Sequence, residues 1–183
     1  MKVALLFAAC LALAVAMPIT DLKGYANCPS AHDLIEQHEG VRDCVYVDTT
    51  GHKTIGVGYN LDQSGARTAI ANIGADFDSI YSGKTCLTSS QVEKLFSSSL
   101  NNAVQEARNV VSGYSGLCSC VQNVMVDMAF NLGQSGLGSF NTFLSYINNH
   151  NWSAAASDVK GTLWCRQVGN RCTQDASIIA SGC

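Results

Sequence analysis

Two consecutive helical segments limit what this chain can fold into more than any other feature of its sequence. Thr88 and Gln91 have the spacing of a capping box, and the apolar residues that follow at helical spacing predict a long helix over about 89–111. Residues 120–132, C-V-Q-N-V-M-V-D-M-A-F-N-L, are apolar on nearly every side, and Gly133 is expected to end that segment. A helix of this kind must be covered all round, so we expect a helical lobe packed about it.

Shorter segments complete the expected helical lobe. A Gly-rich connection leads to a helix over 141–149, and Asn151 starts another that closes at Val159. Residues 162–173 are expected to form a loop, followed by a last short helix around 175–180. Asn151 also begins an N-W-S tripeptide, an N-glycosylation sequence whose occupancy stays open.

The N-terminal part of the chain changes from a helical period to a strand period. Ser30 is a candidate N-cap for a helix over 31–39, and Gly40 stands where a helix ends in a left-handed conformation. From 44 to 59, strand-forming residues lie on either side of a T-T-G turn, which predicts a β-hairpin. Residues 61–86 are polar and Gly-rich and are expected to be irregular.

Together these segments predict an α+β fold, mainly α, with two lobes. Residues 29–87 are expected to form a small lobe from the N-terminal helix and the β-hairpin. Residues 88–183 are expected to form a linking helix and a helical lobe, and both lobes belong to one domain over 17–183. We find no internal repeat.

Residues 1–16 have the form of a secretory signal peptide. Lys2 precedes an apolar run over 3–15, and A-V-A at 14–16 has the small-x-small form of a cleavage site. The run is too short to span a bilayer comfortably, which favours removal over retention as a membrane anchor. We therefore expect residues 17–183 to be secreted, into the extracellular space or a lysosomal or phagosomal compartment.

The cysteines support an oxidising compartment. Cys10 lies in the predicted signal peptide, and the remaining cysteines are an even number, which predicts four disulfides. Their pairing stays open, although Cys165 and Cys172 are spaced to close a short loop. A zinc site is the competing interpretation, but no C-x-x-C or H-x-x-x-H pair stands near them. The remaining cysteines are Cys28, Cys44, Cys86, Cys118, Cys120, Cys165, Cys172 and Cys183.

Charge excludes one class of partner. The formal net charge is −3, from 11 Lys and Arg against 14 Asp and Glu, and the sequence contains no basic run or stripe. Because binding to nucleic acid depends on such a stripe, we expect no nucleic acid as a partner. We also expect no stable membrane association, no cofactor and no metal, and a monomer.

Three polar residues near the hairpin are candidates for chemistry. Glu39 lies in the last turn of its helix, where the negative end of the helix dipole disfavours an ionised carboxylate, as suits a general acid. Asp48 ends one strand and Thr54 lies on the returning strand, so both can point to one face of the hairpin. His38 and His52 flank this stretch without a nucleophile motif such as G-x-S-x-G, and we expect them to be surface histidines.

These residues resemble the pattern of the phage-type lysozymes, glycoside hydrolase family 24. The pattern has E-G at Glu39, T-x-G after Asp48, and Thr54 followed by I-G-V-G. Downstream, M-A-F-N-L-G from Met128, a later G-S-F, and W-C-R-Q-V-G-N-R are similar to the family's central helix, its following turn and its W-x-x-x-x-x-N-R segment. The resemblance covers about residues 31–180. It implies a small β-containing lobe joined by a long helix to a helical lobe.

The resemblance also implies an activity, cleavage of the β-1,4 bond between N-acetylmuramic acid and N-acetylglucosamine in bacterial peptidoglycan. Glu39 would protonate the leaving glycosidic oxygen, Asp48 would act as base toward the attacking water, and Thr54 would help to hold that water. Two carboxylates on separate elements can stand far enough apart to admit water, which implies inversion at the anomeric carbon. Substrate-binding candidates by position are Tyr59, Asn131, Gln167 and Arg171.

The chain departs from the family pattern at one position. Tyr59 stands where the family often has a histidine that supports the surroundings of the catalytic acid. Arg42 and Arg171 are both candidate partners for Glu39, and the sequence leaves the choice open. The mildly acidic, cysteine-rich composition is what an exported eukaryotic relative would have.

Two other functions stay open. One is a catalytically inactive lysozyme-like domain that only binds bacterial glycans, against which stands the presence of Glu39, Asp48 and Thr54 together. The other is a chitin-directed hydrolase, because N-acetylglucosamine occurs in both polymers. A secreted lysozyme itself would serve either antibacterial defence or the digestion of bacteria as food.

Overall fold

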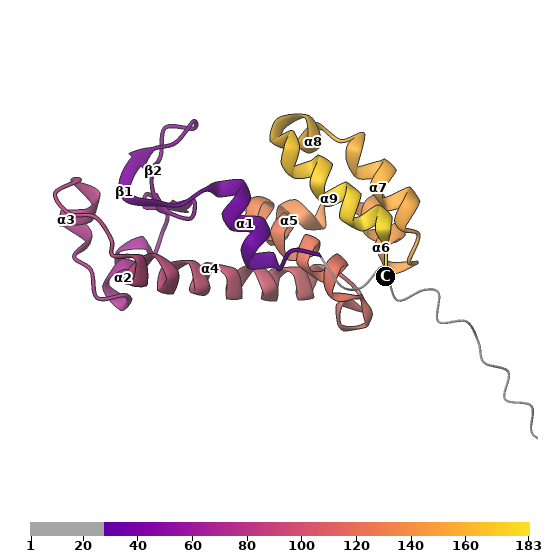
Figure 1. Cartoon of the computed structure of the whole chain (residues 1–183), viewed down its shortest axis with the longest axis horizontal. Helices are drawn as coiled ribbons and strands as arrows, with labels where there is room; N and C mark the ends of the chain where they lie inside the picture. The colour runs from indigo at the N-terminus through magenta and orange to yellow at the C-terminus, as the bar shows by residue number, and fades with distance from the viewer. Residues whose placement is uncertain (1–27) are drawn as a thin grey trace, which may run out of the picture.

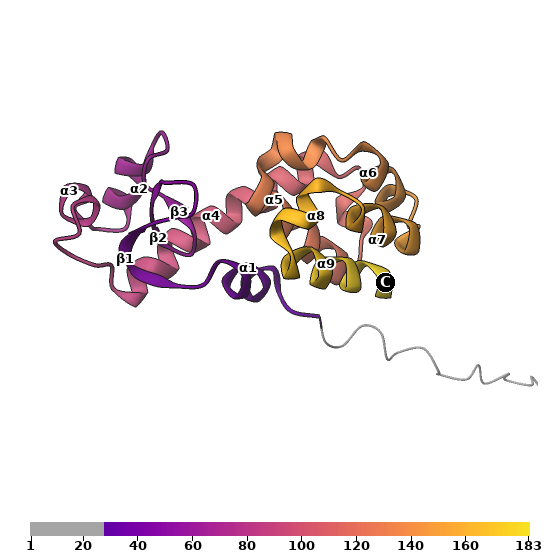
Figure 2. The ribbon, with the colours of Figure 1, turned by 90° about the horizontal axis from the view of Figure 1, so that it is seen from above.

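The computed structural model describes residues 28–183, so the predicted signal peptide lies outside the described residues. The described chain forms two groups of elements at the two ends of one long helix, α4 (Ser89–Val110), as Figure 1 shows. The strands lie at one end and the C-terminal helices at the other, and the view from above in Figure 2 keeps them apart. The predicted two-lobed, mainly helical α+β fold is confirmed.

An antiparallel sheet forms the centre of the N-terminal lobe. The helix α1 (Ala31–Glu39) leads into strands β1 (Arg42–Val47), β2 (Lys53–Gly56) and β3 (Tyr59–Asn60), which pair in chain order. Ser30 caps α1 as predicted, since its hydroxyl accepts the N–H of Asp33 at 3.1 Å. In the first hairpin Tyr46 pairs with Thr54, which fixes the register of the strand that carries this threonine.

The prediction of an irregular segment over 61–86 is wrong. This segment contains two short helices, α2 (Ala66–Asn72) and α3 (Phe77–Tyr81). Asp76 caps α3 by accepting the N–H of Ser79 at 2.8 Å, and the fully buried Ile70 anchors α2. Helices of seven and five residues offer too few turns for an apolar period to stand out in the sequence.

The linking helix α4 has the predicted bounds and the predicted start. Thr88 and Gln91 form both hydrogen bonds of a capping box. One face of α4 is buried, and it packs mainly against α5 (Ser119–Gly138), the central helix of the second lobe. The buried residues of α4 are Val92, Leu95, Phe96, Ala103 and Ala107.

Gly133 interrupts α5 with φ +69° and ψ 170°, as the sequence predicts for the end of this segment. The Gly-rich stretch after it is not a connection, however. It resumes a helix to Gly138, because Leu137 turns into the core and is fully buried.

The C-terminal helices complete the second lobe. The short 3-10 helix η1 (Tyr114–Gly116) precedes α5, and α6 (Asn141–Asn148), α7 (Trp152–Lys160), α8 (Leu163–Val168) and α9 (Asn170–Ser181) follow it. The predicted loop over 162–173 is wrong. The hydroxyl of Thr162 accepts the N–H of Cys165 at 3.1 Å and caps α8, and Gly169 with φ +58° separates α8 from α9.

All eight cysteines in the described part of the chain form disulfides, which confirms the predicted number. Three of the bridges close long stretches of chain, and Cys165–Cys172 closes the short loop that its spacing indicates. Because each of these eight cysteines is in a disulfide, none of the eight has a thiolate to offer to zinc. The long-range bridges are Cys28–Cys120, Cys44–Cys86 and Cys118–Cys183.

The apolar core runs through both lobes and includes the fully buried Met125 and Met128 of α5. Within residues 28–183, no helix combines the length and apolar character needed to cross a bilayer.

Candidate active site

Glu39 ends α1, and its side chain is 23% exposed. The guanidinium of Arg171 on α9 donates from Nη1 to Glu39 Oε1 at 2.7 Å. Arg42, the other candidate partner, instead lies over the ring of Tyr46, with its guanidinium carbon 4.3 Å from the ring centre. Of the two arginines that the sequence leaves open, Arg171 is therefore the partner of Glu39.

Arg171 also holds a second carboxylate. Its Nε and Nη2 donate to the two oxygens of Asp127 on α5, at 2.9 and 3.0 Å, and both side chains are buried. His38 lies 3.1 Å from Asp127 Oδ1 through Nδ1 and 3.1 Å from Gln174 through Nε2. The side chain of His38 is only 7% exposed, so its prediction as a surface histidine is wrong, whereas His52 is half exposed. The guanidinium of Arg171 on α9 thus connects α1, through Glu39, to α5, through Asp127.

Gly58 approaches the other oxygen of Glu39. A Cβ atom placed on Gly58 would lie 2.9 Å from Glu39 Oε2, and the residue has φ +65°. The positive φ favours glycine, and a larger residue here would have to displace the Glu39 carboxyl. Oε1 accepts the hydrogen bond from Arg171, whereas Oε2 accepts none from residues 28–183.

Asp48 lies in the turn between β1 and β2, where its Oδ1 accepts three hydrogen bonds. The donors are the backbone N–H of His52 at 2.9 Å, the Oγ1 of Thr50 at 2.8 Å and the backbone N–H of Thr50 at 2.8 Å. These hydrogen bonds lower the pKa of Asp48 to about 2, the His52 backbone and the Thr50 hydroxyl contributing most. Asp48 is therefore an ionised carboxylate near neutral pH.

Thr54 lies on β2 with its side chain directed at the same carboxylate. It is 3% exposed, and its Oγ1 lies 3.4 Å from Asp48 Oδ2 and 3.3 Å from the carbonyl of His52. Since Oδ1 of Asp48 is fully engaged, Oδ2 is the oxygen that can accept a proton. Thr54 stands beside it.

Tyr46 links the two carboxylates of the site. Burial raises the pKa of its phenol, Arg42 opposes this, and the negative charges of Glu39 and Asp48 raise it further. The strand that carries Tyr46, β1, begins three residues after Glu39 and ends one residue before Asp48, so the two carboxylates flank the same strand.

The profile of the family described as phage lysozyme matches residues 36–174. This chain belongs to the phage lysozyme family. Glycoside hydrolases make up this family.

Individual members of the family align over most of the chain. The chain is 28% identical over 161 residues to "Probable T4-type lysozyme 1" of Dictyostelium discoideum, an alignment that covers 84% of this chain and 95% of that protein. The corresponding "Probable T4-type lysozyme 2" is 26% identical over the same coverage. The "Pre-baseplate central spike protein Gp5" of Enterobacteria phage T4 is also 26% identical, but the aligned part is 28% of that protein.

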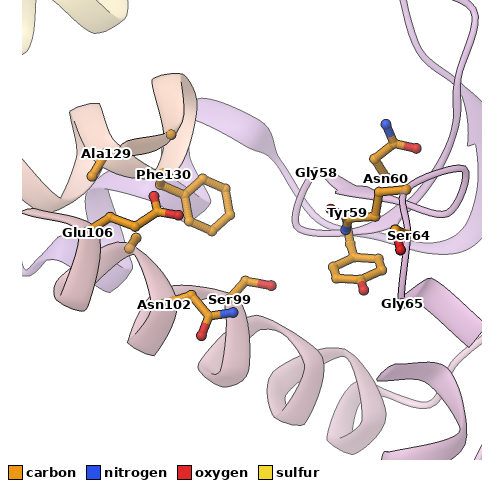
Figure 3. A pocket seen from close by; sticks show the side chains of 13 residues that line it. Gly58, Tyr59, Asn60, Ser64, Gly65, Ser99, Asn102, Glu106, Ala129 and Phe130 are labelled. Atoms are coloured by element: carbon orange, nitrogen blue, oxygen red, sulfur yellow. The ribbon is translucent and has the colours of Figure 1, made fainter. Parts of the chain in front are cut away.

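A cavity of about 390 Å³ begins at Gly58 and opens between the lobes. Figure 3 shows Tyr59, from the sheet side, across the cavity from Phe130 of α5, with Glu106 of α4 beside Phe130. The predicted substrate residue Tyr59 thus lies in a cavity that shares Gly58 with the site. Burial raises the pKa of its phenol, and a hydrogen bond with Gln63 opposes this.

The other predicted substrate residues lie farther along the helical lobe. Asn131 accepts a hydrogen bond from Nε1 of Trp164 at 2.8 Å. Gln167 and Trp164 line a separate cavity of about 490 Å³. Arg171 is buried, and its guanidinium forms ion pairs with Glu39 and Asp127.

Three residues around the site are not predicted from the sequence, although the sequence contains a signal for two of them. Asp127 is the one carboxylate in the apolar run 120–132, which marks it as a buried group in need of a cation. Asp175 stands four residues after Arg171, on the same face of α9. Tyr46 carries no such signal, since a tyrosine in a strand is ordinary.

Proposed function

We propose that this protein is a muramidase that hydrolyses the β-1,4 bond between N-acetylmuramic acid and N-acetylglucosamine in bacterial peptidoglycan. The observation that carries the proposal is the contrast between the surroundings of the two carboxylates that flank β1, Glu39 and Asp48. Asp48 is held ionised by three hydrogen bonds, while one oxygen of Glu39, Oε2, has no donor among residues 28–183. Membership of a glycoside hydrolase family supports the reaction class.

Glu39 is the general acid in this proposal. Its proton passes from Oε2 to the glycosidic oxygen as the bond from that oxygen to the anomeric carbon breaks. The hydrogen bond from Arg171 fixes the carboxyl through Oε1 and leaves Oε2 for the substrate.

Asp48 is the base, and Thr54 helps to hold the attacking water. Asp48 Oδ2 takes one proton from the water while the oxygen of the water bonds to the anomeric carbon. Thr54 Oγ1 lies beside Asp48 Oδ2. A water between two carboxylates attacks the face opposite the leaving group, so we propose that the product has inverted configuration.

Tyr59 and Gln167 are proposed to bind the glycan in the cavities that they line, and Asn131 is proposed to assist next to Trp164, which lines the second cavity. Arg171 contributes through the Glu39 carboxyl that it holds. We propose a monomer that needs no partner other than its substrate, because a cleft enzyme of this size is complete by itself.

We further propose that residues 17–183 are secreted and act in antibacterial defence or in the digestion of bacteria. Four disulfides support an oxidising compartment, since such bonds persist there and are rare in the cytosol.

The release of reducing ends from purified peptidoglycan and from chitin oligomers tests this function. We expect release from peptidoglycan and far less from chitin. Faster cleavage of chitin would make the protein a chitin-directed hydrolase. Binding to peptidoglycan without any release would make it an inactive glycan-binding member of the family.

A further inference from the structure

Asp175 on α9 is a fully buried carboxyl that the proposed reaction does not use. Neither of its oxygens has a hydrogen-bond donor in the described part of the chain. An ionised carboxylate left in this state would be very costly, because nothing replaces the water that it loses on folding. The group therefore requires an explanation.

Asp127, the carboxylate held by Arg171, is the charged group that acts most strongly on Asp175, which stands one turn after Arg171 on the same buried face of α9. Two carboxylates offer no donor to each other, which is why both oxygens of Asp175 remain without one. A proton on Asp175 removes this conflict, since its O–H can then donate to Asp127. Burial and the charge of Asp127 raise the pKa of Asp175 to about 9, and Arg171 only partly opposes them.

The charged and titratable groups around this pair come from three helices. From α1 come His38 and Glu39, from α5 comes Asp127, and from α9 comes Arg171. Asp127 already accepts two hydrogen bonds from Arg171 and one from His38. A second negative charge at Asp175 would compete with Glu39 for the same guanidinium, whereas a neutral, donating Asp175 leaves Nη1 to Glu39.

We propose that Asp175 is a positioning residue for the hydrolysis: its carboxyl carries a proton, donates a hydrogen bond to Asp127, and thereby keeps Arg171 directed at Glu39. The proposal rests on the proposed muramidase function. It adds a chain of contacts, Asp175 to Asp127 to Arg171 to Glu39, that extends from the interior of the helical lobe to the acid.

Two substitutions separate the hydrogen bond from packing. Asp175→Asn keeps the size and supplies an amide donor, while Asp175→Leu is of similar size and has no donor. Ile179→Val is the matched control, because it removes a methylene from the same buried face of α9 and leaves the polar contacts intact.

Kinetics on soluble glycan strands from peptidoglycan test the positioning role. We expect Asp175→Asn to keep kcat within about twofold, and Asp175→Leu to lose about tenfold or more in kcat with KM nearly unchanged, since Asp175 does not reach the substrate. Equal kcat in the two variants, or an equal loss in Ile179→Val, would overturn the role. A wild type that releases no reducing ends would instead overturn the muramidase function and this role with it.

Urea unfolding between about pH 5 and 8 tests the proton independently of activity. The unfolded chain loses the Asp175 proton near pH 4 and the folded chain keeps it to about pH 9, so unfolding releases a proton and stability falls as pH rises. Relative to Asp175→Asn, we expect the wild-type unfolding equilibrium constant to rise up to about tenfold per pH unit. A pH-independent difference between the two proteins would show that Asp175 is ionised in the fold.

Discussion

Arg171 Nη1 lies 2.7 Å from Glu39 Oε1, while the rest of the same guanidinium holds both oxygens of Asp127. Glu39 ends a helix of the N-terminal lobe, whereas Arg171 and Asp127 belong to the helical lobe. A single buried cation therefore fixes the proposed acid at the junction of the lobes. Replacing Arg171 should therefore lower stability through Asp127 and activity through Glu39.

Arg171→Met leaves Asp127 buried without its cation, and we expect a loss of about 3–5 kcal/mol in the free energy of unfolding. Arg171→Met combined with Asp127→Leu removes the isolated charge, so it should recover much of that stability. Neither protein should regain activity, because Glu39 is no longer held. Denaturant unfolding and peptidoglycan clearing measure the two effects. A single variant as stable as the wild type would mean that the ion pair does not support the fold.

Gly58→Ala should reduce activity at least tenfold, because its Cβ would meet Glu39 Oε2 at 2.9 Å. The control is Gly113→Ala, which has a similar positive φ of 69° and nothing within 4 Å of the added atom. Both substitutions should cost roughly 1–3 kcal/mol of stability through backbone strain. Only Gly58→Ala should lose activity beyond what unfolding explains. Equal activities in the two variants would refute the role of Gly58 beside the acid.

Thr50→Val removes one of the three donors to Asp48 Oδ1. The pKa of Asp48 is lowered to about 2 in the wild type, so the base stays ionised down to strongly acidic pH and loses its charge only as the pH falls through that value. Loss of the hydroxyl should raise that pKa, and the acidic limb of the pH–rate profile should move to higher pH by up to about one unit. An unchanged limb would mean that Asp48 is not the base whose ionisation controls the rate.

The disulfides that close longer stretches of chain should stabilise the fold more, with the logarithm of the loop length. Replacing both cysteines of Cys28–Cys120, 92 residues apart, with alanine should cost about 4–5 kcal/mol in the chain-entropy account. Replacing those of Cys165–Cys172, 7 residues apart, should cost only about 2 kcal/mol. Thermal unfolding of the two double variants measures the difference. Similar melting temperatures for the oxidised and reduced wild type would contradict both figures.

Long periodic segments are what the sequence predicts well in this fold. The capping box at Thr88, the amphipathic face of α4 and the break at Gly133 all follow from local rules, and the structure has each of them. The short helices α2, α3 and α8 escape prediction, because one or two turns carry little periodicity and depend on caps such as Asp76 and Thr162. Tertiary packing decides such segments.

At the candidate site, the sequence indicates Glu39, Asp48 and Thr54 through their spacing, but it does not reveal the partner of the acid. Arg171 is 132 residues from Glu39, and only the packing of α9 against α1 and α5 selects it over the nearby Arg42. The burial of His38 has the same origin, since its helix face is covered by Asp127 and Gln174 from distant segments. Roles that depend on long-range contacts of this kind require the structure.

The most direct test of the account is the clearing of a peptidoglycan suspension by the oxidised, signal-free protein beside its Glu39→Gln variant. The substitution keeps the size of the side chain and removes the transferable proton. We expect the wild type to clear the suspension and the variant, equally folded by circular dichroism, to bind peptidoglycan without clearing it. Clearing by Glu39→Gln at the wild-type rate would contradict the acid role of Glu39, and clearing by neither protein would contradict the muramidase function itself.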